Sequence, residues 1–243
     1  MLLDILYQDE YLVAVNKPSG LLVHRSWIDK DETVFALQLV RDQIGQYVYP
    51  VHRLDKPTSG VLLFALDKET ARRLTELFIE KKIHKEYLAV VRGYTDDEDS
   101  IDYALKEQFD KMTHKDVNQD KEPQEAITHY KRLATLELPY PVSRYPVARY
   151  SLVHLEPLTG RKHQLRRHMK HIMHPMVGDT KYGRGEHNKL FRENLDIHEL
   201  LLTAFKISFT HPHTKKELLI QAPLNDAFTK MLKLFNYDLS TTL

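Results

Sequence analysis

Short runs rich in β-branched and aromatic residues, mixed with amphipathic patterns in no regular order, constrain the fold of this chain most strongly. The runs predict strands, and the recurrence of apolar residues every three or four positions predicts helices. Because strands and helices do not alternate regularly, we expect the α+β class, with a mixed, largely antiparallel central sheet flanked by helices. The expected strands are 3–7, 11–16, 61–66, 85–93, 125–138 and 148–158, and the expected helices are 33–45, 68–82 and 161–173.

Boundary residues refine these predictions. Thr33 is suited to begin the first helix as an N-cap and Gly45 to end it, while Asp67 is suited to cap the second helix. The acidic stretch 95–100 has the composition of a solvated loop. The proline-rich stretch 139–146 predicts a surface excursion between two paired strands.

The chain contains no cysteine, which excludes disulfides, cysteine-bound zinc and a thiolate nucleophile. The apolar N-terminus carries Asp4, Asp9 and Glu10 and lacks a basic start, so it does not have the pattern of a signal peptide. No stretch approaches the ~18 to 20 apolar residues of a membrane span. These features favour a cytoplasmic protein that has no membrane partner.

Charge is balanced over the whole chain but not along it. Lysine and arginine total 35 and aspartate and glutamate 34, so the net charge of +1 does not by itself indicate a nucleic-acid partner. The segment 158–178, called here the basic segment, contains no acidic residue. It carries Arg161, Lys162, Arg166, Arg167 and Lys170 together with His163, His168, His171 and His174.

Common cofactor and hydrolase motifs are absent from the sequence. It has no G-x-G-x-x-G, no P-loop, no H-E-x-x-H and no G-x-S-x-G. His168, His171 and His174 follow one another at three-residue steps and raise the possibility of a metal site. No acidic ligand lies near them in the basic segment, so we favour a solvated or RNA-facing role for these histidines and expect no metal.

The polar stretch "HRLDKPTSG" at 52–60 joins two runs that predict strands. Pro57 favours an extended Lys56, Asp55 suits an Asx-type turn, and Gly60 tolerates unusual backbone angles. From these residues alone, a well-formed turn is a better interpretation than a catalytic site.

The full set of motifs changes that balance. "HRLDKPTSG" resembles the signature of the RluA-type pseudouridine synthases. Four further stretches are similar to other motifs of the same family and occur in the same order. They are "NKPSG" at 16–20, "KEY" at 85–87, "LTGRKHQLRRHM" at 158–169 and "HPMVGDTKYG" at 174–183. The resemblance runs over roughly residues 4–225 and is strongest to a branch that acts on tRNA. It implies the pseudouridine synthase fold as a single catalytic domain over 1–243, without the N-terminal S4 domain of some relatives.

The resemblance also implies a reaction and roles for individual residues. A uridine is detached at N1, turned and rejoined through C5, with no cofactor, and Asp55 is the catalytic carboxylate. Whether Asp55 attacks the sugar, attacks the base or removes a sugar proton stays open. A carboxylate shielded from water needs a nearby cation to stay ionised, and the family assigns this role to Arg166. Tyr87 matches the tyrosine that packs against the base.

RNA contacts follow from the same resemblance. Arg53 matches the position that takes part in flipping the nucleotide out of its helix, although a plain phosphate contact is an alternative. His52, Thr58, Ser59 and Gly60 are expected to shape the loop. The basic segment would suit an RNA duplex, which is read through its shape and phosphates. The expected contacts are Lys17, Arg161, Lys162, Arg167 and Lys170, each of which could instead be a solvated charge.

Other functions stay open at this level. The target could be rRNA rather than tRNA, or the chain could be a non-catalytic RNA-binding relative. "DKPTSG" also loosely resembles the loop of an aspartyl phosphotransferase, which would need Mg²⁺ and additional carboxylates. No obligate protein partner is implied.

Overall fold

The computed structural model describes residues 1–24, 32–107, 122–142 and 144–239. The chain forms two compact units, each built from three separate stretches of sequence. The first unit contains residues 1–85, 104–126 and 204–223, and the second contains 86–103, 127–203 and 224–243.

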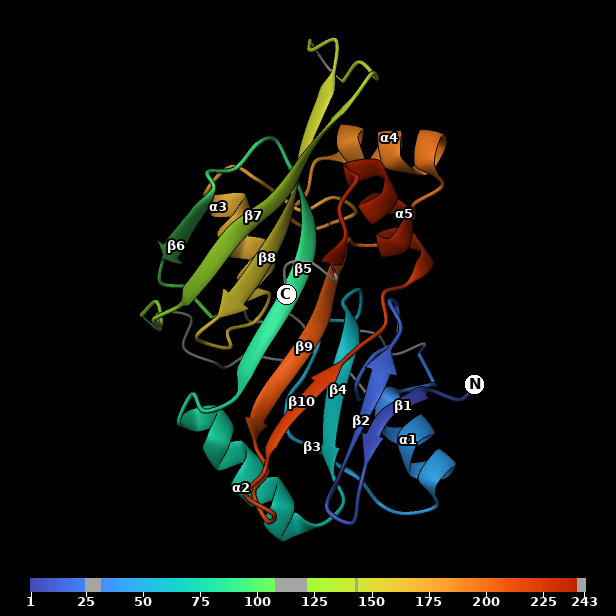
Figure 1. Cartoon of the computed structure of the whole chain (residues 1–243), viewed down its shortest axis with the longest axis vertical. Coiled ribbons are helices and arrows are strands. Elements are labelled where there is room, and N and C mark those ends of the chain that lie inside the picture. Colours follow the sequence, from blue (N-terminus) through green and yellow to red (C-terminus); the bar gives the residue numbers. More distant parts are fainter. Residues whose placement is uncertain (25–31, 108–121, 143, 240–243) are drawn as a thin grey trace, which may run out of the picture. The chain divides into compact units, whose positions relative to one another are not determined.

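The sheet of the first unit has the strand order β1-β2-β4-β9, with β3 beside β4 and β10 beside β9 (Figure 1). The pairs β1–β2, β2–β4, β3–β4 and β9–β10 are all antiparallel. The predicted strands 3–7, 11–16 and 61–66 are confirmed. The strand bounds are β1 Asp4–Gln8, β2 Leu12–Lys17, β3 Tyr49–Pro50, β4 Ser59–Ala65, β9 Leu202–Thr210 and β10 Glu217–Gln221.

Two helices, α1 (Ala36–Ile44) and α2 (Lys68–Ile79), belong to this unit. Asp67 caps α2 as predicted, because its carboxylate accepts the N–H of Thr70 at 2.9 Å. Gly45 ends α1 in the left-handed conformation, at φ 72°. The prediction for Thr33 is wrong, since the N-cap is Phe35 and no side chain caps that end.

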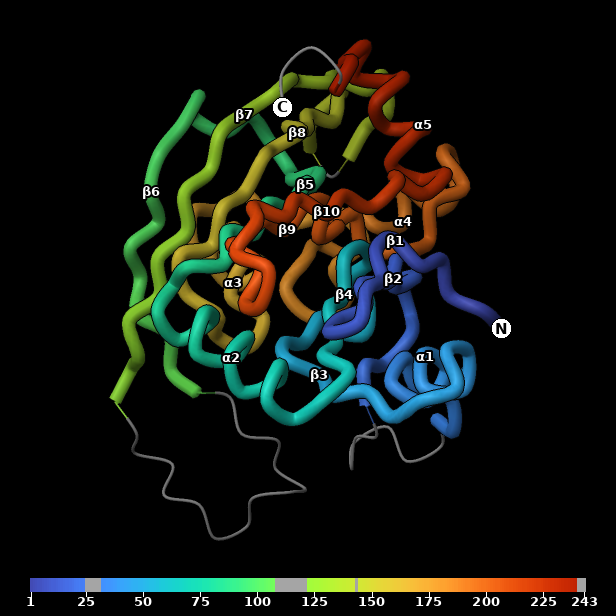
Figure 2. The backbone as a smooth tube through the Cα atoms, turned by 60° about the horizontal axis from the view of Figure 1, so that its bottom comes forward, coloured from blue at the N-terminus to red at the C-terminus, as the bar shows by residue number. Residues whose placement is uncertain are grey.

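Helix α2 fixes the strand that follows the Asp55 turn. Its apolar stripe of Ala71, Leu74 and Phe78 packs into one cluster with Leu12 and Leu63 from the sheet. Figure 2 shows α2 running beside β3. The apolar side chains of α2 and of the sheet are closely packed in this cluster, so the strand that follows the turn between β3 and β4 is held in place.

The second unit contains the sheet β5-β8-β7-β6 with antiparallel β5–β8, β8–β7 and β7–β6 pairs (Figure 1). The acidic stretch expected to be a loop is wrong in part, because 98–102 forms an edge strand. Of its side chains only Ile101 is buried, and the charged ones stay in water, as is common for a sheet edge. The strand bounds are β5 His84–Arg92, β6 Glu98–Asp102, β7 Ile127–Leu138 and β8 Ala148–Pro157.

Helix α3 (Gln164–His171) packs Leu165 and Met169 against Ala89 and Val153 of this sheet. Helices α4 (Gly185–Leu195) and α5 (Asp226–Phe235) complete the unit. The region that holds α4, β9, β10 and α5 contains no predicted element.

The predicted fold class is confirmed, since both units combine helices with largely antiparallel strands. The proline-rich excursion is also confirmed: β7 and β8 pair as far as Leu138 and Ala148, and the excursion joins them. Among the helices that the structure describes, none has both the length and the apolar character needed to span a membrane.

Candidate active site

Asp55 lies in the first unit, in the turn between β3 and β4. Its carbonyl oxygen accepts the N–H of Thr58 at 3.0 Å, which closes the turn, and its side chain is half-buried. Gly60 follows at φ 106°, and a Cβ there would lie 2.1 Å from the carbonyl oxygen of Ala204. Only glycine therefore fits at the point where the turn enters β4.

His52 holds the other side of this turn. Its Nε2 accepts the backbone N–H of Leu63 at 2.9 Å, and its ring stacks on Phe78 at 5.2 Å. Burial, with a contribution from the charge of Lys85, lowers the pKa of His52 to about 3. The imidazole is thus neutral at physiological pH, as an acceptor at Nε2 requires. His52 acts as a brace for the turn.

Lys17, at the end of β2, is completely buried. Its ammonium donates to the carbonyl oxygens of Pro18 and Leu21 at 2.8 Å and of Lys56 at 3.1 Å. Each of the three N–H donors of the Lys17 ammonium thus has a carbonyl acceptor, and these hydrogen bonds link the "NKPSG" loop to Lys56, the residue after Asp55. The expected RNA contact by Lys17 does not fit this burial, because no phosphate can reach a side chain enclosed by main chain.

Two further hydrogen bonds join the same loops. Ser19 Oγ donates to the carbonyl oxygen of Pro57, and the N–H of Gly20 donates to that of Lys56, both at 2.9 Å. Burial lowers the pKa of Lys17 to about 7, and the negative charge of Asp55 opposes this shift. Arg53, in contrast, is exposed.

Tyr87 lies in the second unit, on β5 opposite Leu155. It is half-buried and packs at the border of the cluster that contains Leu165 and Met169 of α3. The sheet and α3 therefore bring Tyr87 and the helix that carries Arg166 to the same apolar cluster.

Arg166 is 5% exposed, so it is not the surface charge that its place in a basic helix suggests. Its Nε and Nη2 donate to Oδ2 and Oδ1 of Asp179 at 2.8 and 2.9 Å. Burial alone would raise the pKa of Asp179, but Arg166 and the N–H groups of Lys181 and Tyr182 hold it below its ordinary value. Sequence reasoning missed Asp179, although it stands in the quoted "HPMVGDTKYG".

The remaining residues of the basic segment divide between surface and core. Arg161 and Lys170 are exposed, and Lys162 and Arg167 are half-buried. His168 is fully buried and bonds to the Thr128 hydroxyl and the Tyr103 carbonyl, so the solvated or RNA-facing role expected for it is wrong.

The other two histidines of that series differ in exposure. His171 is exposed and stacks on Tyr103 at 3.6 Å, while His174 is half-buried and bonds to the Arg92 carbonyl at 2.8 Å. Within the described ranges, no group of three or more His, Asp or Glu side chains could hold a metal ion.

The predicted site residues thus fall in both units, with Asp55 and Arg53 in the first and Tyr87 and Arg166 in the second. The ion pair between Asp55 and Arg166 stays a prediction. A guanidinium has five N–H donors, and the pair with Asp179 uses two of them. Binding to Asp179 is therefore compatible with a second carboxylate at Arg166.

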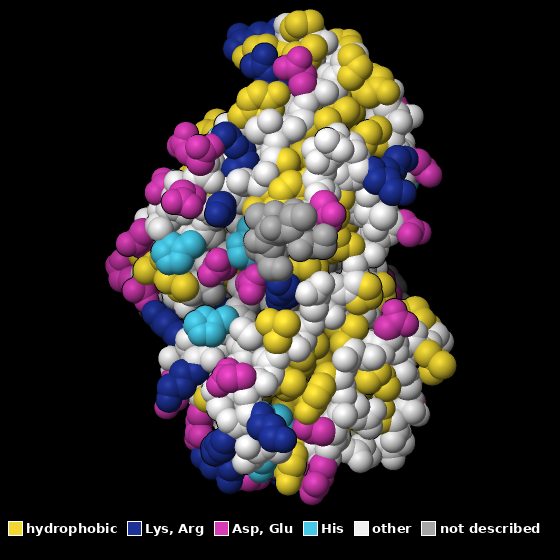
Figure 3. All heavy atoms as spheres, viewed as in Figure 1, with side chains coloured by type: hydrophobic (Ala, Val, Ile, Leu, Met, Phe, Trp, Pro, Cys, Tyr) yellow, Lys and Arg dark blue, Asp and Glu magenta, His cyan; other side chains and the backbone are white. Residues whose placement is uncertain are grey.

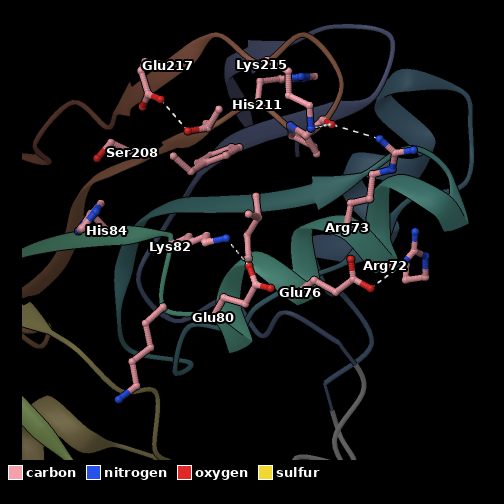
Figure 4. A pocket seen from close by; sticks show the side chains of 15 residues that line it. Arg72, Arg73, Glu76, Glu80, Lys82, His84, Ser208, His211, Lys215 and Glu217 are labelled. Atoms are coloured by element: carbon pink, nitrogen blue, oxygen red, sulfur yellow. Dashed lines mark hydrogen bonds and ion pairs between the residues drawn. The ribbon is translucent and has the colours of Figure 1, made fainter.

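A hollow of about 880 Å³ lies in the first unit between α2 and the β9–β10 hairpin (Figure 4). None of the predicted site residues lines it. Several of its charges are already paired, as Arg72 is with Glu76 and Lys82 with Glu80. Basic and acidic side chains are also interspersed over the face shown in Figure 3. The predicted site residues therefore lie outside this hollow.

Comparison with known sequences identifies the family. The sequence profile of the RNA pseudouridylate synthase family matches residues 11–171. Three relatives named tRNA pseudouridine synthase C are each 54% identical to the chain. They come from Vibrio parahaemolyticus (97% of this chain, 96% of the relative), Pasteurella multocida (99% of each) and Haemophilus influenzae (98% and 99%).

Solved structures give the same result for the fold. Human RNA Pseudouridylate Synthase Domain Containing 4 superimposes with a TM-score of 0.71 at 26% identity, covering 97% of this chain and 94% of that one. Human RNA Pseudouridylate Synthase Domain Containing 1 gives 0.70 at 25% identity, covering 91% and 83%. The chain therefore belongs to the RNA pseudouridylate synthase family, as its resemblance to the RluA-type enzymes predicts.

Proposed function

We propose that this protein converts a specific uridine of tRNA to pseudouridine. The observation that carries the proposal is 54% identity, over nearly the whole length, to relatives that are named for this reaction on tRNA. The chemistry breaks the N1 glycosidic bond and forms a bond from C1′ of the sugar to C5 of the base. Nothing is oxidised or reduced: the proton displaced from C5 goes to water, and N1 takes up a proton from water, so the product is an isomer of uridine.

Asp55 is the proposed catalytic residue, as nucleophile towards the sugar or the base or as the base that removes a sugar proton. The hydrogen bonds around its turn, donated by Lys17 and Ser19 and accepted by His52, support this role because they hold the backbone of a half-buried carboxylate in place. Arg166 is proposed to keep Asp55 ionised, and Tyr87 to pack against uracil.

A uridine within a helix must leave the stack before a side chain can reach C1′ or C5. Arg53 is proposed to assist this step, and its exposure supports that role. Lys17 is left out of the RNA contacts because it is buried. Arg161, Lys162, Arg167 and Lys170 remain as proposed phosphate contacts. We also propose a cytoplasmic location, which the absence of cysteine supports.

The proposal is tested by locating pseudouridines in total RNA from cells with and without the gene, and then in tRNA and rRNA treated with the purified protein. We expect one tRNA site to lose its pseudouridine in the deletion strain and to regain it in vitro. A site lost only in rRNA would reassign the substrate. Tight RNA binding with no pseudouridine formed in either RNA would indicate a non-catalytic relative.

A further inference from the structure

The carboxylate of Asp179 has four hydrogen-bond donors around it. Arg166 supplies two, and the backbone N–H groups of Lys181 and Tyr182 each donate to Oδ1 at 2.9 Å. The side chain of Asp179 has no exposed surface. A bidentate pair in this setting fixes both the position and the plane of the guanidinium.

The face of the same guanidinium is also covered. The Arg166 Cζ lies 5.1 Å from the centre of the Tyr182 ring, and the Tyr182 hydroxyl bonds to His163 Nδ1 at 2.8 Å. Arg166 is therefore held along one edge by a carboxylate and on one face by an aromatic ring.

The loop that carries Asp179 is itself anchored to the strand of Tyr87. The N–H of Arg92 donates to the Pro175 carbonyl at 3.0 Å, and the N–H of Val177 donates to the Val90 carbonyl at 2.9 Å. Asn188 on α4 then bonds to Gly178 N–H and to the carbonyl oxygen of Asp179. Asp179 thus connects Arg166 to β5 through a short segment with several backbone hydrogen bonds.

We propose that Asp179 is a positioning residue for the isomerisation, which acts by holding the Arg166 guanidinium in the orientation that the reaction needs. This inference rests on the proposed function, since it gives Asp179 its role through Arg166. A buried cation could have been satisfied by main-chain carbonyls, as Lys17 is. The bidentate carboxylate instead fixes its direction, which matters where a misplacement of about 1 Å can slow a reaction about 100-fold.

The first test is the single-turnover rate of pseudouridine formation in tRNA for wild type and for Asp179→Asn. The amide keeps one acceptor for the backbone N–H groups but loses the charge and the second acceptor for Arg166. We expect the rate to fall about 100-fold while the Kd for tRNA changes little. Asp9→Asn alters another carboxylate that accepts two backbone N–H groups, those of Tyr11 and Leu12, and it is the matched control that should keep the wild-type rate.

The second test distinguishes positioning from general support of the fold. If Asp179 acts through Arg166, the double variant Asp179→Asn, Arg166→Lys should be no slower than Arg166→Lys alone. A purely structural role would slow the double variant by the product of the two single effects. Should Asp179→Asn fail to fold, as judged by circular dichroism, the same cycle is run with Asp179→Glu, which keeps the charge.

Outcomes for this inference are separate from those for the proposed function. Loss of activity in Asp179→Asn without further loss in the double variant supports the inference. A near-wild-type rate for Asp179→Asn, or multiplicative losses, would overturn it even if Asp55 is essential. A wild-type protein that forms no pseudouridine in any RNA contradicts the proposed function first, and this inference with it.

Discussion

Lys17 and Arg166 illustrate how little the charge of a residue says about its place. Both are cations within sequence motifs, and both are buried, each against a different kind of acceptor. The sequence shows the cation but not every oxygen atom around it, because one acceptor of Lys17, the Lys56 carbonyl, lies 39 positions away and Asp179 lies 13 positions from Arg166.

The burial of Lys17 has a measurable effect on stability. Its pKa is about 7 in the folded chain and 10.5 ordinarily, so between these values the unfolded chain binds a proton that the folded chain does not. The free energy of unfolding should therefore rise with pH in this window, by about 1 kcal/mol per pH unit from this residue.

Urea unfolding of wild type and Lys17→Met at pH 7.5, 8.5 and 9.5 isolates this contribution, since all other groups titrate in both proteins. We expect the variant to lack the rise and so to show a flatter pH dependence. Parallel pH dependences in the two proteins would show that Lys17 does not change its proton affinity on folding.

Helices and strands could be predicted from the sequence where residues close together in the chain determine them. Asp67 begins α2 because its side chain replaces a missing hydrogen-bond acceptor, a signal contained in a few residues. The edge strand 98–102 was missed because its charged residues have low strand propensity, and only pairing with β7 makes it a strand. Phe35 begins α1 without a side-chain cap, so that boundary depends on tertiary contacts instead.

The packing of β4 against β9 at Gly60 leads to a prediction about stability. Gly45 and Gly60 both have positive φ, but a Cβ at Gly45 would meet open space, while one at Gly60 would meet the backbone of Ala204 on β9. Gly45→Ala should therefore lower the free energy of unfolding by about 1 to 2 kcal/mol, from backbone strain alone. Gly60→Ala should lower it by about 3 kcal/mol or more, because β4 and β9 must separate.

Chemical unfolding of the two variants provides the comparison. Similar losses in both would mean that the close approach of β9 does not constrain the Asp55 turn.

At the scale of the molecule, the order of the motifs identified the family, and the α+β class followed from the mixture of patterns. The assignment of the expected site residues to two units did not follow, because each unit is assembled from three stretches of sequence and no motif records this. The residues expected to act together lie in two units, with the Asp55 turn braced in one and Arg166 clamped by Asp179 in the other. Asp179 was not predicted, since a carboxylate in a glycine-containing loop usually forms part of a turn.

The central claim is that the carboxylate of Asp55 performs the chemistry and is not merely part of a well-formed turn. Asp55→Asn keeps the turn, because the contact to Thr58 uses the backbone carbonyl of Asp55 and those from Lys17 and Ser19 use the carbonyls of Lys56 and Pro57.

The most direct measurement is the release of tritium from tRNA labelled at C5 of uridine, with tRNA affinity and the unfolding transition measured on the same preparations. We expect Asp55→Asn to release no tritium while it binds tRNA and unfolds as wild type does. Release at the wild-type rate would contradict the account and leave Asp55 with the role of a turn residue.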